Sequence, residues 1–239
     1  GKLEVSVGQR LSYPEERIVR GEAEALVDET FDDLAVMLVD NPAPLAWRCG
    51  APSLFDSQLH RGKVPMTKEA VRTLAVARME VAPEHTVWDV GAGTGSVSCA
   101  LAMAAFRGQV YAVEREVDAV ALIEENRASF GLSNLHVVLG EAPKALLDLP
   151  KPDRVFVGGS GGEMEEIFRA ALTKNPAVRI CLTAVSLESL TQGLRVFEGL
   201  GLQNVDVTQL TAAQAKVLGS YHMMLGQNPV YILSGEGQP

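Results

Sequence analysis

The sequence predicts an α/β protein built on a seven-stranded, mostly parallel sheet whose last strand is antiparallel. From residue 86 onward, short apolar runs alternate with longer helical patterns, which is typical of parallel strands joined by helices. A glycine-rich turn joins the first apolar run to the helix that follows it. No helical pattern separates the last two apolar runs, so we expect these two strands to pair antiparallel.

The first element of this domain is a helix that opens at Met66 and continues to about Arg78. Thr67 is its expected N-cap, and Glu69 favours the positive end of the helix dipole. Expected strands then cover residues 86–90, 109–113, 136–139, 154–157, 178–183, 204–210 and 230–233. Expected helices cover residues 96–107, 117–130, 143–148, 163–173 and 187–199.

The first 42 residues do not look like a complete domain. Residues 3–7 and 34–39 are typical of strands, and an acidic, turn-rich stretch lies between them. Because two or three strands cannot bury a core alone, this segment is either an edge addition to the main domain or part of a larger one. Prolines at 42 and 44 break the chain. We therefore expect an N-terminal segment with its linker at 1–44 and the main domain at 45–239.

Composition excludes several classes of protein. The formal net charge of −9 argues against nucleic acid as a partner, and no apolar run approaches the roughly 18 residues that span a membrane. The N-terminus lacks the apolar core of a signal peptide. Cys49, Cys99 and Cys181 are isolated, which favours a reducing cytoplasm over a disulfide framework. Neither these cysteines nor the four histidines have metal-ligand spacing, so we expect no metal site.

A basic stretch interrupts this acidic chain. Residues 48–78 carry six Lys and Arg residues against two acidic ones. A local excess of positive charge before the glycine-rich turn indicates a small polyanionic substrate, although solvated surface charges are the alternative. The basic residues are Arg48, Arg61, Lys63, Lys68, Arg72 and Arg78.

The glycine-rich turn is the most informative motif. A dinucleotide fingerprint, G-x-G-x-x-G, would need glycine where Ser96 stands. The pattern acid-x-G-x-G-x-G fits without a mismatch, and in this it resembles S-adenosylmethionine methyltransferases. The helix start after the turn would receive the cofactor carboxylate. The alternative is a plain strand–helix turn. The residues of the expected cofactor turn are Asp89, Gly91, Ala92, Gly93, Thr94 and Gly95.

A second acid supports an adenosyl ligand. Glu114 ends the second expected strand, 25 positions after Asp89. A carboxylate there can accept hydrogen bonds from a ribose diol, while Asp89 would orient the amino group of the methionine moiety. Five small residues (Gly158, Gly159, Ser160, Gly161 and Gly162) follow the fourth expected strand, where ligands bind in open α/β sheets. They leave an open floor for a flat, bulky ligand, whereas the alternative is a flexible turn.

Further motifs narrow the family. They are residues 65–72 (PMTKEAVR), 140–146 (GEAPKAL), 157–163 (VGGSGGE) and 227–230 (QNPV). Together with the cofactor turn, they resemble the C-terminal half of precorrin-6B C5,15-methyltransferases (decarboxylating), which also occurs as a standalone cobalt-precorrin C15-methyltransferase. The resemblance covers roughly residues 45–235. The N-terminal segment looks like the end of the tetrapyrrole-methylase half that precedes this domain in fused enzymes, and that half would be inactive here.

The resemblance implies the fold of class I S-adenosylmethionine methyltransferases. It also implies methylation of a precorrin at C15, decarboxylation of the C12 acetate in cobalamin biosynthesis, and a homotetramer. By position, Thr67 and the glycine turn contact S-adenosylmethionine, Glu114 binds ribose and Ala142 lies by adenine. Relatives often have Asp where this chain has Glu114 and Glu141, and the longer side chains can still reach a diol.

Methyl transfer needs alignment rather than an obligatory catalytic side chain, whereas decarboxylation benefits from a proton donor. Candidate donors are His60, Lys68, Tyr221 and His222, and the candidate substrate contacts are Arg48, Lys68, Arg72 and residues 158–161. Residues 223–225 (MML) favour core or subunit packing over a substrate wall. The alternatives are methylation of another small molecule or of RNA, and a cofactor-binding module without catalysis.

Overall fold

The computed structural model describes residues 3–41 and 54–238 of the chain. These residues belong to two compact units, Gly1–Cys49 and Gly50–Pro239. Within the described residues, no helix has the length and apolar character that crossing a membrane requires.

The first unit is an antiparallel sheet with the strand order β2-β1-β3. Its strands are β1 (Glu4–Gln9), β2 (Arg17–Glu22) and β3 (Ala35–Asp40), and the short 3-10 helix η1 (Ala23–Leu26) follows β2. The sequence analysis missed β2, because none of its residues is buried and its apolar residues mark no core face. None of these strands belongs to the seven-stranded sheet, which counts against the alternative of an edge addition to that sheet.

The second unit contains the predicted seven-stranded sheet, in the order β6-β5-β4-β7-β8-β12-β9. The parallel strands are β4 (Thr86–Val90), β5 (Gln109–Glu114), β6 (Leu135–Leu139), β7 (Arg154–Val157) and β8 (Arg179–Ala184). Strand β12 (Val230–Glu236) runs antiparallel between β8 and β9 (Gln203–Leu210), which confirms the predicted architecture. Because the strand order reverses at β4, the crevice beyond the carboxyl ends of β4 and β7 is the expected ligand site.

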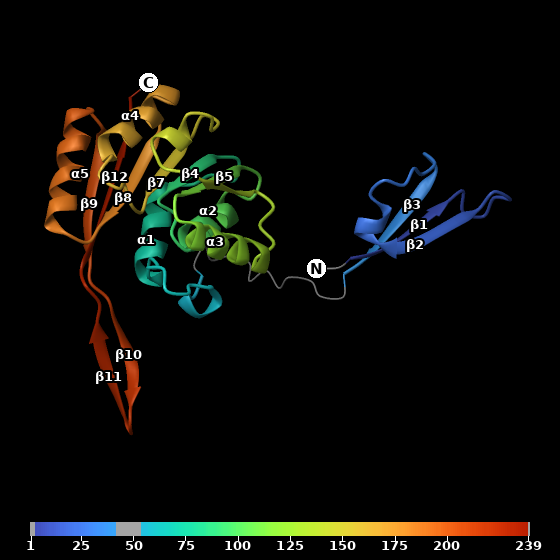
Figure 1. Ribbon diagram of the computed structural model, residues 1–239, viewed down its shortest axis with the longest axis horizontal. Helices are drawn as coiled ribbons and strands as arrows, with labels where there is room; N and C mark the ends of the chain where they lie inside the picture. Colours follow the sequence, from blue (N-terminus) through green and yellow to red (C-terminus); the bar gives the residue numbers. More distant parts are fainter. Residues whose placement is uncertain (1–2, 42–53, 239) are drawn as a thin grey trace. The chain divides into compact units, whose positions relative to one another are not determined.

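Helices cover both faces of this sheet (Figure 1). One face carries α1 (Glu69–Met79), α2 (Ser96–Ala104) and α3 (Val117–Ser129), whose apolar residues belong to one core cluster. The other face carries η3 (Lys144–Leu146), α4 (Met164–Lys174) and α5 (Leu187–Gly199), which belong to a second cluster. The sheet is thus buried on both sides, as expected for parallel strands.

Helix α1 starts later than the sequence predicted. Its N-cap is Lys68 and no side chain caps it, so the assignment of Thr67 as N-cap is wrong. The buried residues of the helix recur at helical spacing and so form one face, which includes a charged residue. The residues of this face are Val71, Arg72, Ala75, Val76 and Met79.

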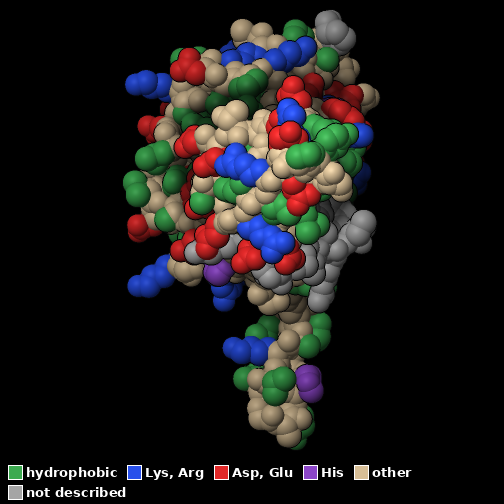
Figure 2. All heavy atoms as spheres, turned by 90° about the vertical axis from the view of Figure 1, so that its right-hand side faces the viewer, with side chains coloured by type: hydrophobic (Ala, Val, Ile, Leu, Met, Phe, Trp, Pro, Cys, Tyr) green, Lys and Arg blue, Asp and Glu red, His purple; other side chains and the backbone are tan. Residues whose placement is uncertain are grey.

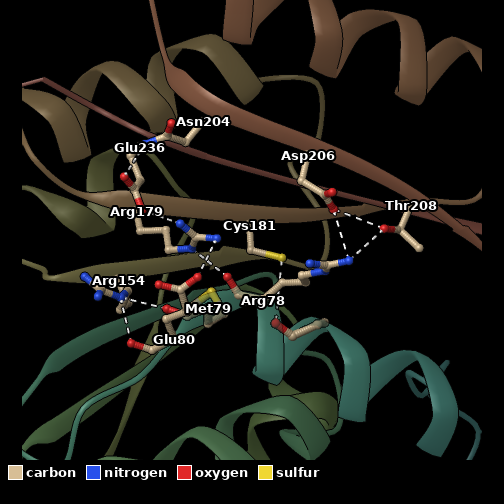
Figure 3. A network of polar contacts seen from close by, with 11 residues as sticks. Arg78, Met79, Glu80, Arg154, Arg179, Cys181, Asn204, Asp206, Thr208 and Glu236 are labelled. Carbon is tan, nitrogen blue, oxygen red and sulfur yellow. Dashed lines mark hydrogen bonds and ion pairs between the residues drawn. The ribbon is translucent and has the colours of Figure 1, made fainter.

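Arginine side chains from the sheet hold the C-terminal end of α1 (Figure 3). Arg179, at the start of β8, donates to the carbonyl oxygen of Arg78 at 2.6 Å and pairs with Glu80 at 3.1 Å. Arg154, at the start of β7, donates to the carbonyl oxygen of Glu80 at 3.2 Å. Cations at a helix C-terminus satisfy its last carbonyl groups and oppose its dipole. These contacts fix α1 at the amino ends of β7 and β8.

Strands β10 (Ala213–Leu218) and β11 (Tyr221–Gly226) form an antiparallel hairpin that extends away from the sheet as a narrow arm (Figure 1, Figure 2). The sequence analysis treated this region as a connection. Every residue of the two strands is exposed, and Tyr221 reaches 74% exposure. Core packing of residues 223–225 is therefore excluded within this chain.

Candidate functional site

A cleft of about 1330 Å³ lies at the carboxyl ends of β4, β5, β7 and β8. Drug-sized ligands usually occupy about 300–1,000 Å³, so this cleft has room for a cofactor and a second ligand. The structure brings most of the predicted site residues together here. Those that line the cleft are Thr67, Lys68, Asp89, Gly91, Ala92, Gly93, Thr94, Glu114, Ala142, Gly158, Gly159, Ser160 and Gly161.

The turn after β4 packs directly on the turn after β7. Gly91 has a φ of 70°, and a Cβ atom there would lie 2.5 Å from the carbonyl oxygen of Gly159. A Cβ atom on Gly158 would lie 3.0 Å from the carbonyl oxygen of Gly91. Packing within the protein therefore requires glycine at 91, where the φ is also positive, and disfavours a side chain at 158.

Helix α2 begins directly after the glycine turn, with Gly95 as its N-cap. A Cβ atom on Gly95 would lie 2.9 Å from a side-chain carbon of Ile123, so Gly95 faces α3 and does not line the cleft. A Cβ atom on Gly93 would lie 3.4 Å from the carbonyl oxygen of Pro65, and both residues line the cleft. The N–H groups and positive dipole end of α2 therefore lie beside a narrow cradle that suits an anionic group.

Asp89 has a fully buried side chain at the border of the cleft. The Ser98 hydroxyl donates a hydrogen bond to Oδ2, whereas Oδ1 has no hydrogen-bond partner in the described part of the chain. Burial, together with the nearby charge of Glu114, raises the pKa of Asp89 to about 7, against the opposing effect of the Ser98 hydrogen bond. A cationic group beside Oδ1 would restore the ionised carboxylate.

The Glu114 carboxylate is held by the backbone at the end of β5. It accepts hydrogen bonds from the N–H groups of Gly93 at 2.8 Å, Arg115 at 2.8 Å and Glu116 at 3.1 Å. Since an ionised carboxylate offers roughly four acceptor positions, it can still accept a donor from a ligand in the cleft. The same contact with Gly93 fixes the glycine turn.

The basic residues of the stretch 48–78, part of which belongs to α1, lie in different surroundings. Lys63 and Lys68 line the cleft. Arg72 is fully buried and donates to the carbonyl oxygen of Thr67 at 2.6 Å while it pairs with Asp56 at 3.1 Å. The structure therefore contradicts the expectation that Arg72 contacts a substrate, because its guanidinium holds the segment before the helix. The predicted contact at Arg48 lies outside the described residues.

The proton-donor candidates are dispersed. Lys68 lines the cleft, but His60, Tyr221 and His222 are not among the residues that do. The ring of His60 contacts the Ser129 hydroxyl of α3 at 3.2 Å. Tyr221 and His222 are exposed on the β11 strand of the hairpin. Within one chain, the structure therefore contradicts the assignment of these three side chains to the site.

Sequence reasoning missed several polar residues of the cleft. Arg115 pairs with Glu141 at 3.2 Å, and both side chains line the cleft. Thr183 of β8 and Asn228 before β12 line it as well. Their positions in the sequence could have indicated them. Arg115 and Thr183 stand at the carboxyl ends of strands, where ligands bind in open α/β sheets. Asn228 precedes an antiparallel strand that starts at the same edge of the sheet.

The described residues contain no group of His, Cys, Asp and Glu side chains that could hold a metal ion. The cleft instead combines buried or backbone-held carboxylates, a helix N-terminus, an open glycine floor and lysines. These groups fit a ligand that carries an amino group, a carboxylate and a diol. The remaining volume and the lysines fit a larger anionic ligand beside it.

Comparison with known proteins agrees with this geometry. A family model described as a precorrin methyltransferase domain matches residues 58–236. The chain is 38% identical over 181 residues to the cobalt-precorrin-6B C(15)-methyltransferase (decarboxylating) of Salmonella typhimurium, covering 75% of this chain and 93% of that protein.

Two crystal structures are also similar to this chain. Precorrin-6y C5,15-methyltransferase from Geobacter metallireducens has a TM-score of 0.72 at 35% identity, with 77% of this chain and 97% of that chain covered. The C-terminal domain of precorrin-6Y C5,15-methyltransferase from Rhodobacter capsulatus has a TM-score of 0.67 at 33% identity, with 78% and 98% covered.

Proposed function

The chain belongs to the precorrin methyltransferase family, and from this premise we propose that it methylates a precorrin at C15 with S-adenosylmethionine and decarboxylates the C12 acetate. The fold is that of class I S-adenosylmethionine methyltransferases. The observation that carries the proposal is the cleft of about 1330 Å³, in which the glycine turn that follows Asp89 and the glycine run after β7 lie side by side.

The cofactor half of the cleft consists of the glycine turn, Asp89 and Glu114. We assign the ammonium group of the cofactor to the unpartnered Oδ1 of Asp89, and its carboxylate to the start of α2. Glu114 would accept a hydrogen bond from a ribose hydroxyl, and Ala142 would lie beside the adenine. When bound, S-adenosylmethionine supplies an electrophilic methyl group, which the acceptor carbon takes with its own electron pair.

The acceptor half is formed by the glycine run and the lysines. A precorrin carries acetate and propionate groups, and Lys63 and Lys68 offer charged donors for them. Residues 158–161 carry no bulky side chain, so a flat macrocycle can approach the cofactor half. Alignment of this kind supplies about 7–11 kcal/mol in favourable cases, and the protein's contribution to methyl transfer is this alignment.

The test is a product assay with purified protein, S-adenosylmethionine, and metal-free or cobalt-bearing precorrin-6B in separate reactions. The proposal expects a product that has gained one methyl group and lost one carbon dioxide. Methyl gain without carbon dioxide loss would contradict the decarboxylation. The variant Gly93→Val should abolish turnover by filling the cradle, whereas Gly201→Val is the control, because Gly201 shares a positive φ with Gly93 and no atom lies within 4 Å of a Cβ atom there.

We also propose that the protein is a homotetramer and that the β10–β11 hairpin contributes to its subunit contacts. The hairpin exposes Val217, Leu218, Tyr221 and Met224, and Lys216 is the one Lys, Arg, Asp or Glu residue among residues 213–226. An exposed apolar arm of this kind marks an interaction surface. Light scattering should give a tetramer mass, and Met224→Lys should lower it. A monomer mass for the unmodified chain would contradict the proposal.

We propose that the first unit belongs to a tetrapyrrole-methylase domain, which in fused enzymes precedes the methyltransferase domain. Its support is strand β3, where Val36, Met37, Leu38 and Val39 are all exposed in this unit. A sheet with such a strand is expected to pack against further elements of a larger domain. Binding of a hydrophobic dye to the chain should fall in the double variant Val36→Thr, Leu38→Thr, and unchanged binding would count against the proposal.

A further inference from the structure

Asn126 is a fully buried polar residue on α3 that touches two other parts of the structure. Its Oδ1 accepts a hydrogen bond from the backbone N–H of His60 at 2.8 Å. Its Nδ2 donates to the carbonyl oxygens of His60 at 2.8 Å and Thr94 at 2.9 Å. One side chain therefore joins α3, the glycine turn and the segment of residues 54–68 before α1, which we name the pre-α1 segment.

The contact with Thr94 determines the geometry of the glycine turn. The Thr94–Gly95 peptide is held from both sides, because its carbonyl oxygen accepts from Asn126 and its N–H donates to the carbonyl oxygen of Ala92 at 2.9 Å. The next residue, Ser96, opens α2. A fixed peptide at this position fixes the direction in which the first N–H groups of α2 point.

The contact with His60 determines the position of the pre-α1 segment. His60 is held through both its backbone N–H and its carbonyl oxygen, as in a strand pairing. Lys63 and Thr67, a few residues further on, line the cleft. Asn126 itself does not line the cleft.

We propose that Asn126 is a positioning residue. It holds the glycine turn and the pre-α1 segment, which both contribute to the cleft, in fixed positions relative to each other. The inference deepens the proposed function, because it rests on the cleft binding an adenosyl cofactor. Loss of the Asn126 amide would free the Thr94 carbonyl group and His60 together. Cofactor affinity would then fall although no group that touches the cofactor has changed.

The chain offers a matched control in Asn134. Its Nδ2 also donates to two backbone carbonyl oxygens, those of Ala102 at 2.9 Å and Ala105 at 2.8 Å. These carbonyl groups belong to the C-terminal end of α2, and Asn134 does not line the cleft. Asn126→Asp and Asn134→Asp keep the shape of the side chain and remove the same donor group.

The experiment measures S-adenosylhomocysteine binding by calorimetry and backbone exchange by hydrogen–deuterium mass spectrometry on the intact chain. Asn126→Asp should weaken binding at least about tenfold, whereas Asn134→Asp should stay within about twofold. Asn126→Asp should also speed exchange in residues 60–64 and 93–97 together. A purely structural role predicts equal effects on binding for both variants.

Equal affinities for the two variants, or faster exchange in only one of the two segments, would overturn the inference. If Asn126→Asp fails to fold, Asn126→Ser against Asn134→Ser repeats the comparison, since serine keeps one donor. Failure of the unmodified chain to bind S-adenosylhomocysteine would contradict the proposed function instead. The exchange measurement would still decide the role of Asn126 in that case.

Discussion

Replacement of Asp89 by asparagine should stabilise the protein without ligand in a pH-dependent manner. Burial raises the pKa of this carboxyl group to about 7 from its ordinary value of 3.8. Between these values the folded protein holds a proton that the unfolded chain has lost. Folding stability therefore falls as pH rises through this interval, and it falls no further above about 7.

The size of the effect follows from the pKa difference. Each pKa unit corresponds to about 1.4 kcal/mol. The unmodified protein therefore loses roughly 2 kcal/mol of unfolding free energy between about pH 5.5 and 7. Asparagine cannot ionise and keeps an acceptor for the Ser98 hydroxyl. The free energy of unfolding of Asp89→Asn, relative to that of the unmodified protein, should therefore rise by about 2 kcal/mol from about pH 5.5 to about pH 8.5.

The assay is urea unfolding at both pH values, followed by tryptophan fluorescence, because Trp88 is fully buried in β4. The same variant should lose affinity for S-adenosylhomocysteine, since its Oδ1 position no longer carries a charge. A stability difference between the two proteins that is equal at both pH values would refute the assignment of a raised pKa to Asp89.

Three further predictions concern the same cleft. Calorimetry should show S-adenosylhomocysteine binding more tightly as pH rises from about 6 to 8, while methylthioadenosine, which lacks the amino-acid part, shows no such trend. Arg72→Met should cost about 3–5 kcal/mol in urea unfolding, because Asp56 loses its partner, and a cost under about 1 kcal/mol would contradict a structural role. Lys63→Glu and Lys68→Glu should each raise KM for the precorrin at least about tenfold without changing S-adenosylhomocysteine affinity, and exposed Arg61→Glu is the matched control. Unchanged KM in both lysine variants would remove the lysines from the acceptor site.

The sequence predicted the seven-stranded sheet because buried strands and helices leave periodic apolar patterns. The β10–β11 hairpin escaped prediction for the same physical reason, since all its residues are exposed and no buried face imposes a pattern. Strand β2 was missed in the same way. Elements without a core face are therefore the ones that periodicity cannot find.

The site was predicted where backbone geometry determines residue type. Asp89, Glu114 and residues 91–94 of the glycine turn lie in the cleft, because a strand–turn–helix unit places them there, whereas Gly95 faces α3. Arg72 was wrongly assigned to the substrate site because it is basic, although its position in the helix indicates burial. It shares a helical face with Ala75, Val76 and Met79, and that spacing indicates burial. Asn126 left no sequence signal, since its partners are 32 and 66 positions away.

The backbone contact between Gly91 and the turn after β7 also bears on redesign of the acceptor site. A side chain on Gly158 would crowd Gly91, because its Cβ atom would lie 3.0 Å from the Gly91 carbonyl oxygen. At Gly159, no atom lies within 4 Å of a Cβ atom, and its φ lies outside the left-handed region. Position 159 is therefore where a library of small side chains could reshape the acceptor pocket while the cofactor turn keeps its conformation.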